Sequence, residues 1–445
     1  MNLFDGPRGI AVKILNRIDR TDAYLDKVIE SEMRNTDLKG ADKALLYEIA
    51  HGCIRWLNKL DWILTGFYKG QFIKCIPNVK NAMRVALYQI LFLDKVPPYA
   101  AVNEAVEFVK KLQGKKSADL TNAVLRNIIR NKENIRFPNR EEDLIGYFSA
   151  YYSHPIWLIK RWLKQFGEAF TEELLIANNE KPSLTLRVNN LVSNKDEVKK
   201  LLQSVKQHYQ DTKYNSEFIR LKSLSNISDW EYFKNGYVTI QDESTGFPCK
   251  LLDPKPGMKV LDICSAPGGK TAFLADLMQN KGEIVALDLF ESRLNILEKN
   301  IERLGVKNVR TVAVDALEFE ETGFDKILAD VPCSGLGTLT KKPDIKWKRS
   351  LSGLNKLTKL QYSLLEKCAS LVKVGGEIVY STCTIDKVEN FDIVEKFLKE
   401  HPDFKLVKAD SIFDDILIDA NGCVQTFPHI HGIDGAFAAK IIREK

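Results

Sequence analysis

From about residue 236 onward, the chain alternates short runs of β-branched apolar residues with amphipathic helical segments. The expected strands cover residues 258–264, 282–288, 308–315, 324–330 and 376–382. Apolar runs of this length, separated by helices, are typical of a parallel sheet that is covered on both faces. The pattern therefore predicts a doubly wound α/β domain over residues 236–445. Its last segment, GAFAAKIIREK, is expected to form a final antiparallel strand at an edge of the sheet.

The first third of the chain has apolar residues at helical rather than strand spacing. They recur every three or four positions in ADKALLYEIAHGCIRWLNKLDWILTGFY and in shorter stripes up to about residue 130. Residues that interrupt helices, namely Pro77, the Pro97-Pro98 pair and Gly114, fall between these stripes. We therefore expect a compact all-α bundle over residues 1–140.

Residues 141–235 join these two regions and show no long periodic pattern. A short amphipathic helix is expected in YSHPIWLIKRWLKQFG, and LTLRVN, at residues 184–189, alternates like a strand. This stretch predicts a small α/β connector. The chain is thus expected to have three domains, 1–140, 141–235 and 236–445.

Positive charge is concentrated in the expected helical bundle. Residues 1–140 carry 24 Lys and Arg against 15 Asp and Glu, whereas the remainder of the chain carries 41 against 44. A basic module joined to a near-neutral one suggests that the first holds a polyanion, such as a nucleic acid, and that the second processes it.

Composition excludes several classes of protein. The longest apolar runs, such as YQILFL, fall far short of the ~18 residues that a membrane span needs, and MNLFDGPRGI contains no signal-peptide core. No two of the eight cysteines form a CxxC pair, which disfavours both a disulfide scaffold and a zinc site. We expect a cytoplasmic protein with reduced thiols, no metal site and no membrane segment.

A ligand loop is expected directly after the first strand of the α/β domain. The segment CSAPGGK, at 264–270, lies between that strand and a helix, which is where ligands bind in such sheets. Gly268 and Gly269 allow the backbone to approach a ligand closely, and Pro267 stiffens the turn. The segment matches neither GxGxxG nor the Walker pattern, which argues against a dinucleotide dehydrogenase or an ATPase.

Acidic residues close the strands that follow. Asp288 ends the second strand, where a carboxylate can hold the two hydroxyl groups of a ribose, and Asp315 ends the third, placed to bind an adenine amino group. Acids at three successive strand ends suit a nucleoside without phosphate, because carboxylates repel a pyrophosphate.

Two cysteines end the fourth and fifth strands. Cys333 lies in ADVPCSGLGT and Cys383 in YSTCTI, so both are expected above the same crevice as the ligand loop. A thiol there can act as a nucleophile if its pKa is lowered or a base lies close. Asp330 precedes Cys333 by three residues and could bond a ring, and no histidine nearby in sequence supports a Cys-His hydrolase. His429 and His431 are too few for a metal site and are expected in a loop.

The motifs CSAPGGK, DVPCSG and STCT, in this order, resemble those of the RNA cytosine-C5 methyltransferases that use S-adenosylmethionine. The helical first third, with TNAVLRNIIR, is similar to the NusB RNA-binding fold. A fusion of the two resembles the RsmB (Fmu/Sun) family of bacterial 16S rRNA methyltransferases. The resemblance implies an all-α NusB-like domain, a small α/β connector and a Rossmann-like, seven-stranded methyltransferase domain.

The resemblance also implies roles for individual residues. Cys383 would be the nucleophile that adds to C6 of the cytosine, Cys333 would assist release, and Asp330 would bond the exocyclic amine and N3. Lys270 would face the target base or the cofactor, and Arg293 is a secondary candidate for cofactor binding. The implied cofactor site comprises Cys264, Ser265, Ala266, Pro267, Gly268, Gly269, Lys270, Asp288, Arg293, Asp315 and Asp330.

The family's target is cytosine-967 of 16S rRNA, bound in part by the basic N-terminal domain, and a monomer is expected. Two alternatives stay open: the same chemistry on tRNA or another rRNA, and a non-catalytic RNA-binding scaffold. The presence of Cys383, Cys333 and Asp330 argues against the scaffold. DNA methylation is disfavoured because those enzymes use the proline-cysteine thiol as nucleophile and lack the second motif.

Overall fold

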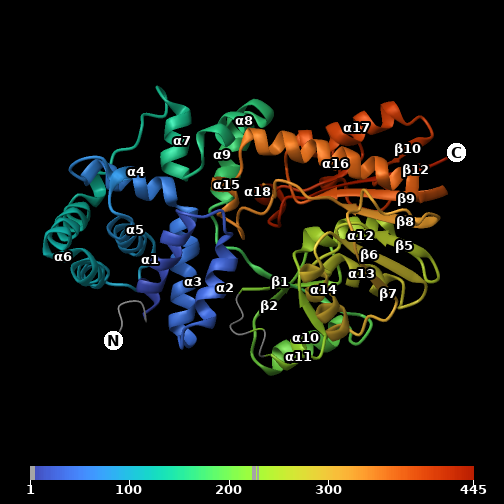
Figure 1. The fold of residues 1–445 in the computed structure, drawn as a ribbon, viewed down its shortest axis with the longest axis horizontal. Coiled ribbons are helices and arrows are strands. Elements are labelled where there is room, and N and C mark those ends of the chain that lie inside the picture. Colours follow the sequence, from blue (N-terminus) through green and yellow to red (C-terminus); the bar gives the residue numbers. More distant parts are fainter. Residues whose placement is uncertain (1–5, 223–226, 228–229) are drawn as a thin grey trace. The chain divides into compact units, whose positions relative to one another are not determined.

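The computed structural model describes residues 6–222, 227 and 230–445 and divides into two units (Figure 1). The first runs to Glu180 and also contains Leu339–Lys348, whereas the second contains Lys181–Thr338 and Arg349–Lys445. No helix in the described ranges is long and apolar enough to cross a membrane. The boundaries expected at residues 140 and 235 remain predictions.

The first unit is all-helical in its described residues, and the all-α bundle expected over residues 1–140 lies within it (Figure 1). Its α-helices are α1 (Pro7–Ile18), α2 (Leu25–Arg34), α3 (Gly40–Arg55), α4 (Leu57–Phe67), α5 (Pro77–Phe92), α6 (Pro98–Arg130), α7 (Leu144–Tyr152), α8 (Ile156–Phe166), α9 (Glu168–Ala177) and α15 (Ile345–Lys348). Short 3₁₀ turns, η1 (Phe72–Lys74) and η2 (Lys132–Asn134), join some of them.

The predicted helix breakers lie where the chain changes direction. Pro77 and Pro98 each occupy the first position of a helix, where a missing N–H costs nothing. Gly114 interrupts α6 with a φ of +79°, a conformation that favours glycine. The predicted stripes face inward, since Ile49, Met83 and Val109 are all buried in one core cluster.

Segment 339–348, although it comes from the second half of the chain, packs into this helical unit. The Lys346 ammonium group is buried and donates to the carbonyl oxygen of Arg55 at 2.8 Å. The Trp347 indole donates to the carbonyl oxygen of Ile54 at 2.7 Å. Both acceptors lie at the end of α3, where helix carbonyls have no partner within the helix.

The second unit begins with a small antiparallel sheet of strand order β2-β3-β1-β4. Its elements are β1 (Leu184–Val188), α10 (Lys195–Ser204), β2 (Tyr209–Asp211), β3 (Phe218–Leu221), α11 (Glu231–Lys234) and β4 (Val238–Ile240). The predicted strand at 184–189 is therefore present, but its side chains do not alternate between buried and exposed. Arg187 is completely buried and forms an ion pair with Asp276, so both faces of β1 are covered.

The larger sheet has strand order β10-β12-β9-β8-β5-β6-β7, and β11 pairs with β12. Its strands are β5 (Lys259–Asp262), β6 (Glu283–Asp288), β7 (Val309–Ala313), β8 (Phe324–Asp330), β9 (Val372–Thr382), β10 (Phe404–Val407), β11 (Val424–Gln425) and β12 (Phe437–Arg443). The five predicted strands form its parallel part.

The final strand is antiparallel, as expected, but its predicted edge position is wrong. Within the described residues, β12 lies between β9 and β10, because the FKLV run at 404–407 adds a further strand beyond it. The structure thus has seven strands along the path of the sheet, with the short β11 in addition.

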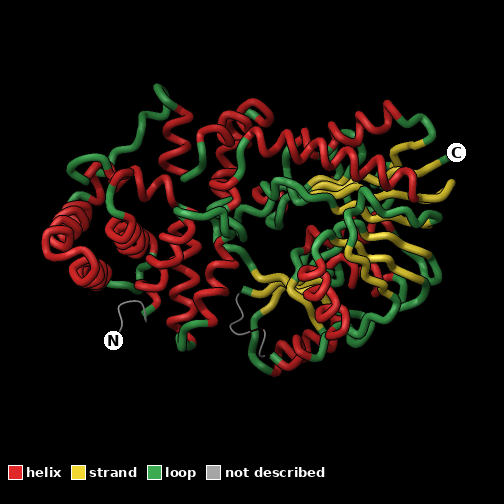
Figure 2. Tube along the Cα trace, in the orientation of Figure 1, coloured by secondary structure: helices red, strands yellow, loops and turns green. Residues whose placement is uncertain are grey.

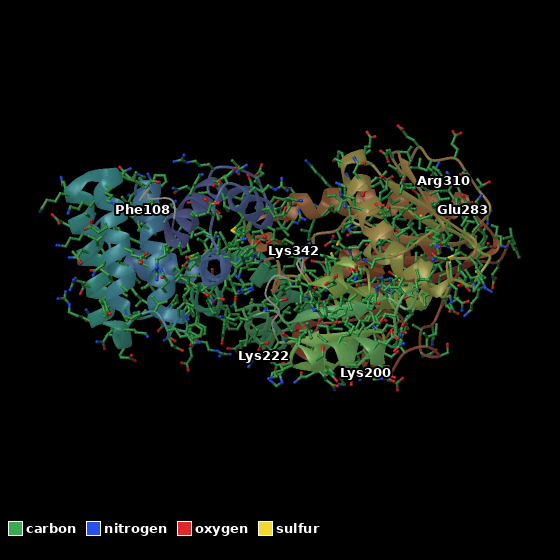
Figure 3. The ribbon with its side chains drawn as sticks, turned by 90° about the horizontal axis from the view of Figure 1, so that it is seen from below. Phe108, Lys200, Lys222, Glu283, Arg310 and Lys342 are labelled. Carbon is green, nitrogen blue, oxygen red and sulfur yellow. The ribbon has the colours of Figure 1, made fainter. Side chains whose placement is uncertain are left out.

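Helices cover both faces of this sheet (Figure 2). They are α12 (Gly246–Leu252), α13 (Gly269–Leu277), α14 (Glu291–Arg303), α16 (Leu351–Leu371) and α17 (Phe391–Glu400). Neighbouring positions face opposite sides, since Val260 joins the core beneath α12 and α13 whereas Leu261 joins the core beneath α16 and α17. Away from the core, Arg310 of β7 donates to Glu283 of β6 at 3.0 Å (Figure 3).

Candidate active site

The predicted ligand loop follows β5 and turns into α13. Gly268 has a φ of +96°, and a Cβ atom there would lie 2.8 Å from Cγ of Leu297, so only glycine fits. Asp262, at the end of β5, is buried and accepts a hydrogen bond from the Thr271 hydroxyl at 2.8 Å. Burial raises the pKa of Asp262 to about 7. Asp262 Oδ1 has no hydrogen-bond partner among the described residues.

Asp288 ends β6, as the sequence predicts, and is almost fully buried. Its Oδ1 accepts a hydrogen bond from the backbone N–H of Phe290 at 3.1 Å. Arg293 lies beside it, with Nη1 2.9 Å from Asp288 Oδ2, and donates through Nη2 to the carbonyl oxygen of Ala266 at 2.7 Å. Arg293 therefore ties the end of β6 to the ligand loop.

Other predicted cofactor residues line the same edge of the sheet. Ser265 donates through its backbone N–H and its hydroxyl to the carbonyl oxygen of Leu287, at 2.8 and 2.9 Å. The Pro267 carbonyl oxygen accepts a hydrogen bond from Asn300. Asp315 is half-buried just after β7 and accepts a hydrogen bond from the backbone N–H of Leu317.

Lys270 and Asp330 connect the ligand loop to the end of β8. Lys270 Nζ donates to Asp330 Oδ2 at 2.7 Å, and the Ser381 hydroxyl donates to Asp330 Oδ1 at 2.8 Å. Burial alone would lower the pKa of Lys270, but the charge of Asp330 outweighs it and raises that pKa above its ordinary value. The ammonium group of Lys270 therefore stays charged, and Asp330 is held from two sides.

The two predicted cysteines lie in direct contact. Cys333 Sγ is 3.2 Å from Cys383 Sγ, and the backbone N–H of Cys383 points to Cys333 Sγ at 3.3 Å. The hydrogen bond with Cys383 and burial both raise the pKa of Cys333 well above its ordinary value. Cys333 is thus suited to remain a thiol that donates a hydrogen bond to the sulfur of Cys383.

Six cysteines remain besides this pair. None of the eight cysteines, all of which lie in the described ranges, forms a disulfide; Cys53, Cys249, Cys368 and Cys423 are buried, whereas Cys75 and Cys264 are half-buried. Burial raises the pKa of Cys264, which makes this loop residue a poor nucleophile.

The prediction of a loop for the two histidines is wrong, because His429 and His431 lie in the short helix α18 (Pro428–His431). His431 bonds to the carbonyl oxygen of Ile416, which gives it a structural contact. Pro428 is fixed at a φ compatible with the first turn of a helix, and Gly432 follows in a left-handed conformation that ends it.

Sequence reasoning missed several polar residues around the cysteines, of which Gln361, Glu389 and Asn390 are buried and Arg349 is half-buried. Arg349 donates to the carbonyl oxygen of Ser334 at 2.8 Å, and Gln361, Glu389 and Asn390 bond to segments that flank Cys333 or Cys383. The only signal available was the polar run VEN shortly after STCT, which resembles an ordinary solvated turn.

The residues of this edge fit a methyl donor that carries a nucleoside and an amino acid. Asp288 offers a buried carboxylate for ribose hydroxyl groups, and the unpartnered Oδ1 of Asp262 offers an acceptor beside the ligand loop. Gly268 places no side chain where the loop meets the start of α13, so a ligand can approach the backbone there. The carboxylates at the strand ends suit a sulfonium and an ammonium group rather than phosphates, and Lys270 and Arg293 are each paired with one of these carboxylates.

Fold and site together are those of a methyltransferase. The family model described as 16S rRNA methyltransferase RsmB/F matches residues 249–442, the NusB family matches residues 6–130, and an RsmF/B-like ferredoxin-like domain matches residues 154–228. The chain belongs to the family of ribosomal RNA small subunit methyltransferase B proteins.

Relatives match almost over the full length of the chain. The probable ribosomal RNA small subunit methyltransferase B of Bacillus subtilis is 35% identical, over 97% of each chain. The protein of the same description from Synechocystis is 32% identical, over 98% of each. A solved structure named PH0851 superimposes with a TM-score of 0.83 at 29% identity, covering 98% of this chain and 99% of that one.

A second solved structure is a methyltransferase homologue from Pyrococcus horikoshii. It is 30% identical, has a TM-score of 0.59, and covers 66% of this chain and 97% of its own. The likeness to a solved methyltransferase homologue therefore covers 66% of this chain, and the likeness to PH0851 covers 98% of it.

Proposed function

We propose that this chain transfers a methyl group from S-adenosylmethionine to C5 of a cytosine in 16S rRNA, with the family's cytosine-967 as target. The observation that carries the proposal is the contact between Cys333 and Cys383, 3.2 Å apart and beside the Asp330–Lys270 pair. Relatives described as ribosomal RNA small subunit methyltransferases support rRNA as the substrate class.

In the proposed reaction Cys383 adds its sulfur to C6 of the cytosine, and the thiol proton ends on ring N3. This addition moves electron density to C5, which is otherwise too poor a nucleophile. S-adenosylmethionine supplies the electrophilic methyl group that C5 takes up. The C5 proton is then lost to solvent water. Cleavage of the C6–S bond returns the N3 proton to the Cys383 sulfur, which restores the aromatic ring and releases Cys383 as a thiol.

Cys333 assists the last step because it holds a proton next to the departing sulfur. Its raised pKa keeps it a thiol, and the 3.2 Å separation allows it to stabilise the departing Cys383 thiolate by donating a hydrogen bond to it. Asp330 accepts hydrogen bonds from the exocyclic amine and from protonated N3. Lys270 and Ser381 fix the two oxygens of that carboxylate in advance, so that little reorganisation is needed during reaction.

Cofactor binding is assigned to the ligand loop, residues 264–270, together with Asp288 and Asp315. Asp288 would hold the ribose and Asp315 the adenine, while Arg293 acts by orienting Asp288. Asp330 lies at the border of the cofactor and base sites, since it bonds to Lys270 of the loop.

The helical unit is proposed to bind RNA phosphates. Four exposed lysines, Lys110, Lys111, Lys115 and Lys116, flank Gly114 in α6. Such a group suits a backbone contact without base specificity. A monomer that acts in the cytoplasm is expected.

Methyl transfer tests the proposal directly. The protein is incubated with radiolabelled S-adenosylmethionine and unmodified 16S rRNA or tRNA, and the product is mapped by bisulfite sequencing. The expected result is one protected cytosine in 16S rRNA. Label on tRNA alone would show that tRNA is the substrate and would leave the proposed chemistry intact. No label on free rRNA, tRNA or assembled subunits would support the alternative of a non-catalytic RNA-binding scaffold.

A further inference from the structure

Two consecutive buried polar residues lie behind the cysteine pair. Glu389 ends the turn η5 (Lys387–Glu389), Asn390 precedes α17, and both side chains are at most 1% exposed. A buried carboxylate is costly unless its oxygens are hydrogen-bonded, and burial indeed raises the pKa of Glu389. Packing alone does not explain why a carboxylate and an amide are buried beside the two cysteines.

Glu389 holds the segment that carries Cys333. Its Oε2 accepts hydrogen bonds from the backbone N–H of Ser334 at 2.8 Å and from Gln361 Nε2 at 2.9 Å. Gln361 Nε2 also donates to the carbonyl oxygen of Pro332 at 3.0 Å. The residues immediately before and after Cys333 are therefore fixed through one carboxylate.

Asn390 holds the segment that carries Cys383 in the same manner. Its Oδ1 accepts from the Thr382 hydroxyl at 2.6 Å, and its Nδ2 donates to the carbonyl oxygen of Thr384 at 3.0 Å. The residues immediately before and after Cys383 are thus fixed through one amide. Because Glu389 and Asn390 share a peptide bond, the two cysteine segments are attached to a single point of the backbone.

We propose that Glu389 and Asn390 are positioning residues that set the distance between Cys333 and Cys383. The inference rests on the proposed two-cysteine reaction and adds to it that each of these two residues positions a different cysteine. Displacement of a reacting group by about 1 Å can cost about a hundredfold in rate, so attachments on both sides of each cysteine matter. Glu389 serves release through Cys333, and Asn390 serves adduct formation through Cys383.

The two positions are therefore expected to fail in opposite ways. Glu389→Ala frees the Cys333 segment, so a covalent protein–RNA adduct forms and persists. Asn390→Ala frees the Cys383 segment, so the adduct forms slowly and does not accumulate. Glu389→Gln keeps an oxygen that can replace Oε2 and is expected to restore most of the release rate. Glu395→Ala, an exposed carboxylate of α17, is the matched control.

The deciding experiment has one readout without RNA. Diamide oxidises the two thiols to a Cys333–Cys383 disulfide and is itself reduced to the hydrazine, and the linked peptides are quantified by mass spectrometry. Glu389→Ala and Asn390→Ala are each expected to slow this reaction about tenfold or more relative to Glu395→Ala. Disulfide formation at the control rate in both variants would overturn the proposal.

The RNA readout uses single-turnover adduct formation and decay on denaturing gels. Unchanged decay in Glu389→Ala, or unchanged formation in Asn390→Ala, would also overturn the proposal that each residue positions a different cysteine. If Glu389→Ala does not fold, Gln361→Ala removes the link to Pro332 and is expected to slow decay in the same direction. Wild-type protein and Cys333→Ala run alongside: absence of any adduct in Cys333→Ala would instead contradict the proposed reaction itself.

Discussion

Arg293 and Asp288 form an ion pair with an Nη1–Oδ2 distance of 2.9 Å, and the same guanidinium group bonds to the carbonyl oxygen of Ala266 at 2.7 Å. Asp288 is buried, whereas Arg293 is half-exposed. The strand end that is proposed to hold the ribose is thereby fixed to the loop that is proposed to hold the rest of the cofactor.

Asp288→Ala is expected to weaken binding of S-adenosylmethionine by roughly 1–3 kcal/mol, because charge-assisted hydrogen bonds in a buried site are lost. Titration calorimetry on the folded variant measures the change. Glu291→Gln, which alters an exposed acid in the first turn of α14, is the control and is expected to bind as the wild type does. An unchanged affinity in Asp288→Ala would contradict the assignment.

Asp262 is expected to make stability depend on pH in the protein without cofactor. Its pKa is about 7 in the folded chain and 3.8 ordinarily, so between these values the folded state retains a proton that the unfolded state has released. Stability therefore falls as pH rises through this window, by at most about 1.4 kcal/mol per pH unit from this group.

Asp262→Asn, which keeps an oxygen for the Thr271 hydroxyl, removes this term. The free energy of unfolding in urea is measured at pH 5 and at pH 8. Relative to the wild type, that of the variant is expected to be higher at pH 8 than at pH 5 by roughly 2 kcal/mol. Asp253→Asn, at an exposed position, is expected to run parallel to the wild type. A constant difference between Asp262→Asn and wild type would show that Asp262 titrates normally.

The lysines of α6 are expected to set the salt dependence of RNA binding. Charge reversal at Lys111 and Lys116 should reduce the slope of log affinity against log salt by roughly 1.4, if each lysine contacts one phosphate of single-stranded RNA. Filter binding over a range of salt concentrations measures it. Reversal of two exposed lysines of α17, Lys396 and Lys399, changes the net charge equally. Equal slopes for the two double variants would place the RNA elsewhere.

Much of the candidate site could be predicted because the local sequence pattern and the topology of the sheet agree there. Parallel strands bring their carboxyl ends to one edge, so Asp288, Asp330, Cys333 and Cys383 fall together once the strands are recognised. The contact of Cys333 with Cys383 follows from the adjacency of β8 and β9, which the order of strands along the sequence does not specify.

Features that depend on distant partners could not be predicted. Lys346 looks like a surface lysine in KKPDIKWKR, yet it is buried because helix α3 offers carbonyl oxygens to it. In a strand that alternates between buried and exposed residues, Arg187 would lie at an exposed position. It is buried instead, and Asp276 of α13 compensates its charge. In the sequence, Glu389 looks like a solvated turn residue. Only the fold shows that it accepts a hydrogen bond from the backbone N–H of Ser334, next to Cys333.

The most direct test of the two-cysteine reaction is a denaturing gel of labelled target RNA after incubation with S-adenosylmethionine and each cysteine variant. Cys333→Ala is expected to accumulate a covalent protein–RNA band, and Cys383→Ala is expected to lose methylation while it still binds the cofactor. The double variant is expected to give no band. A band that persists without Cys383, or full methylation by Cys383→Ala, would contradict the assignment of Cys383 as the nucleophile.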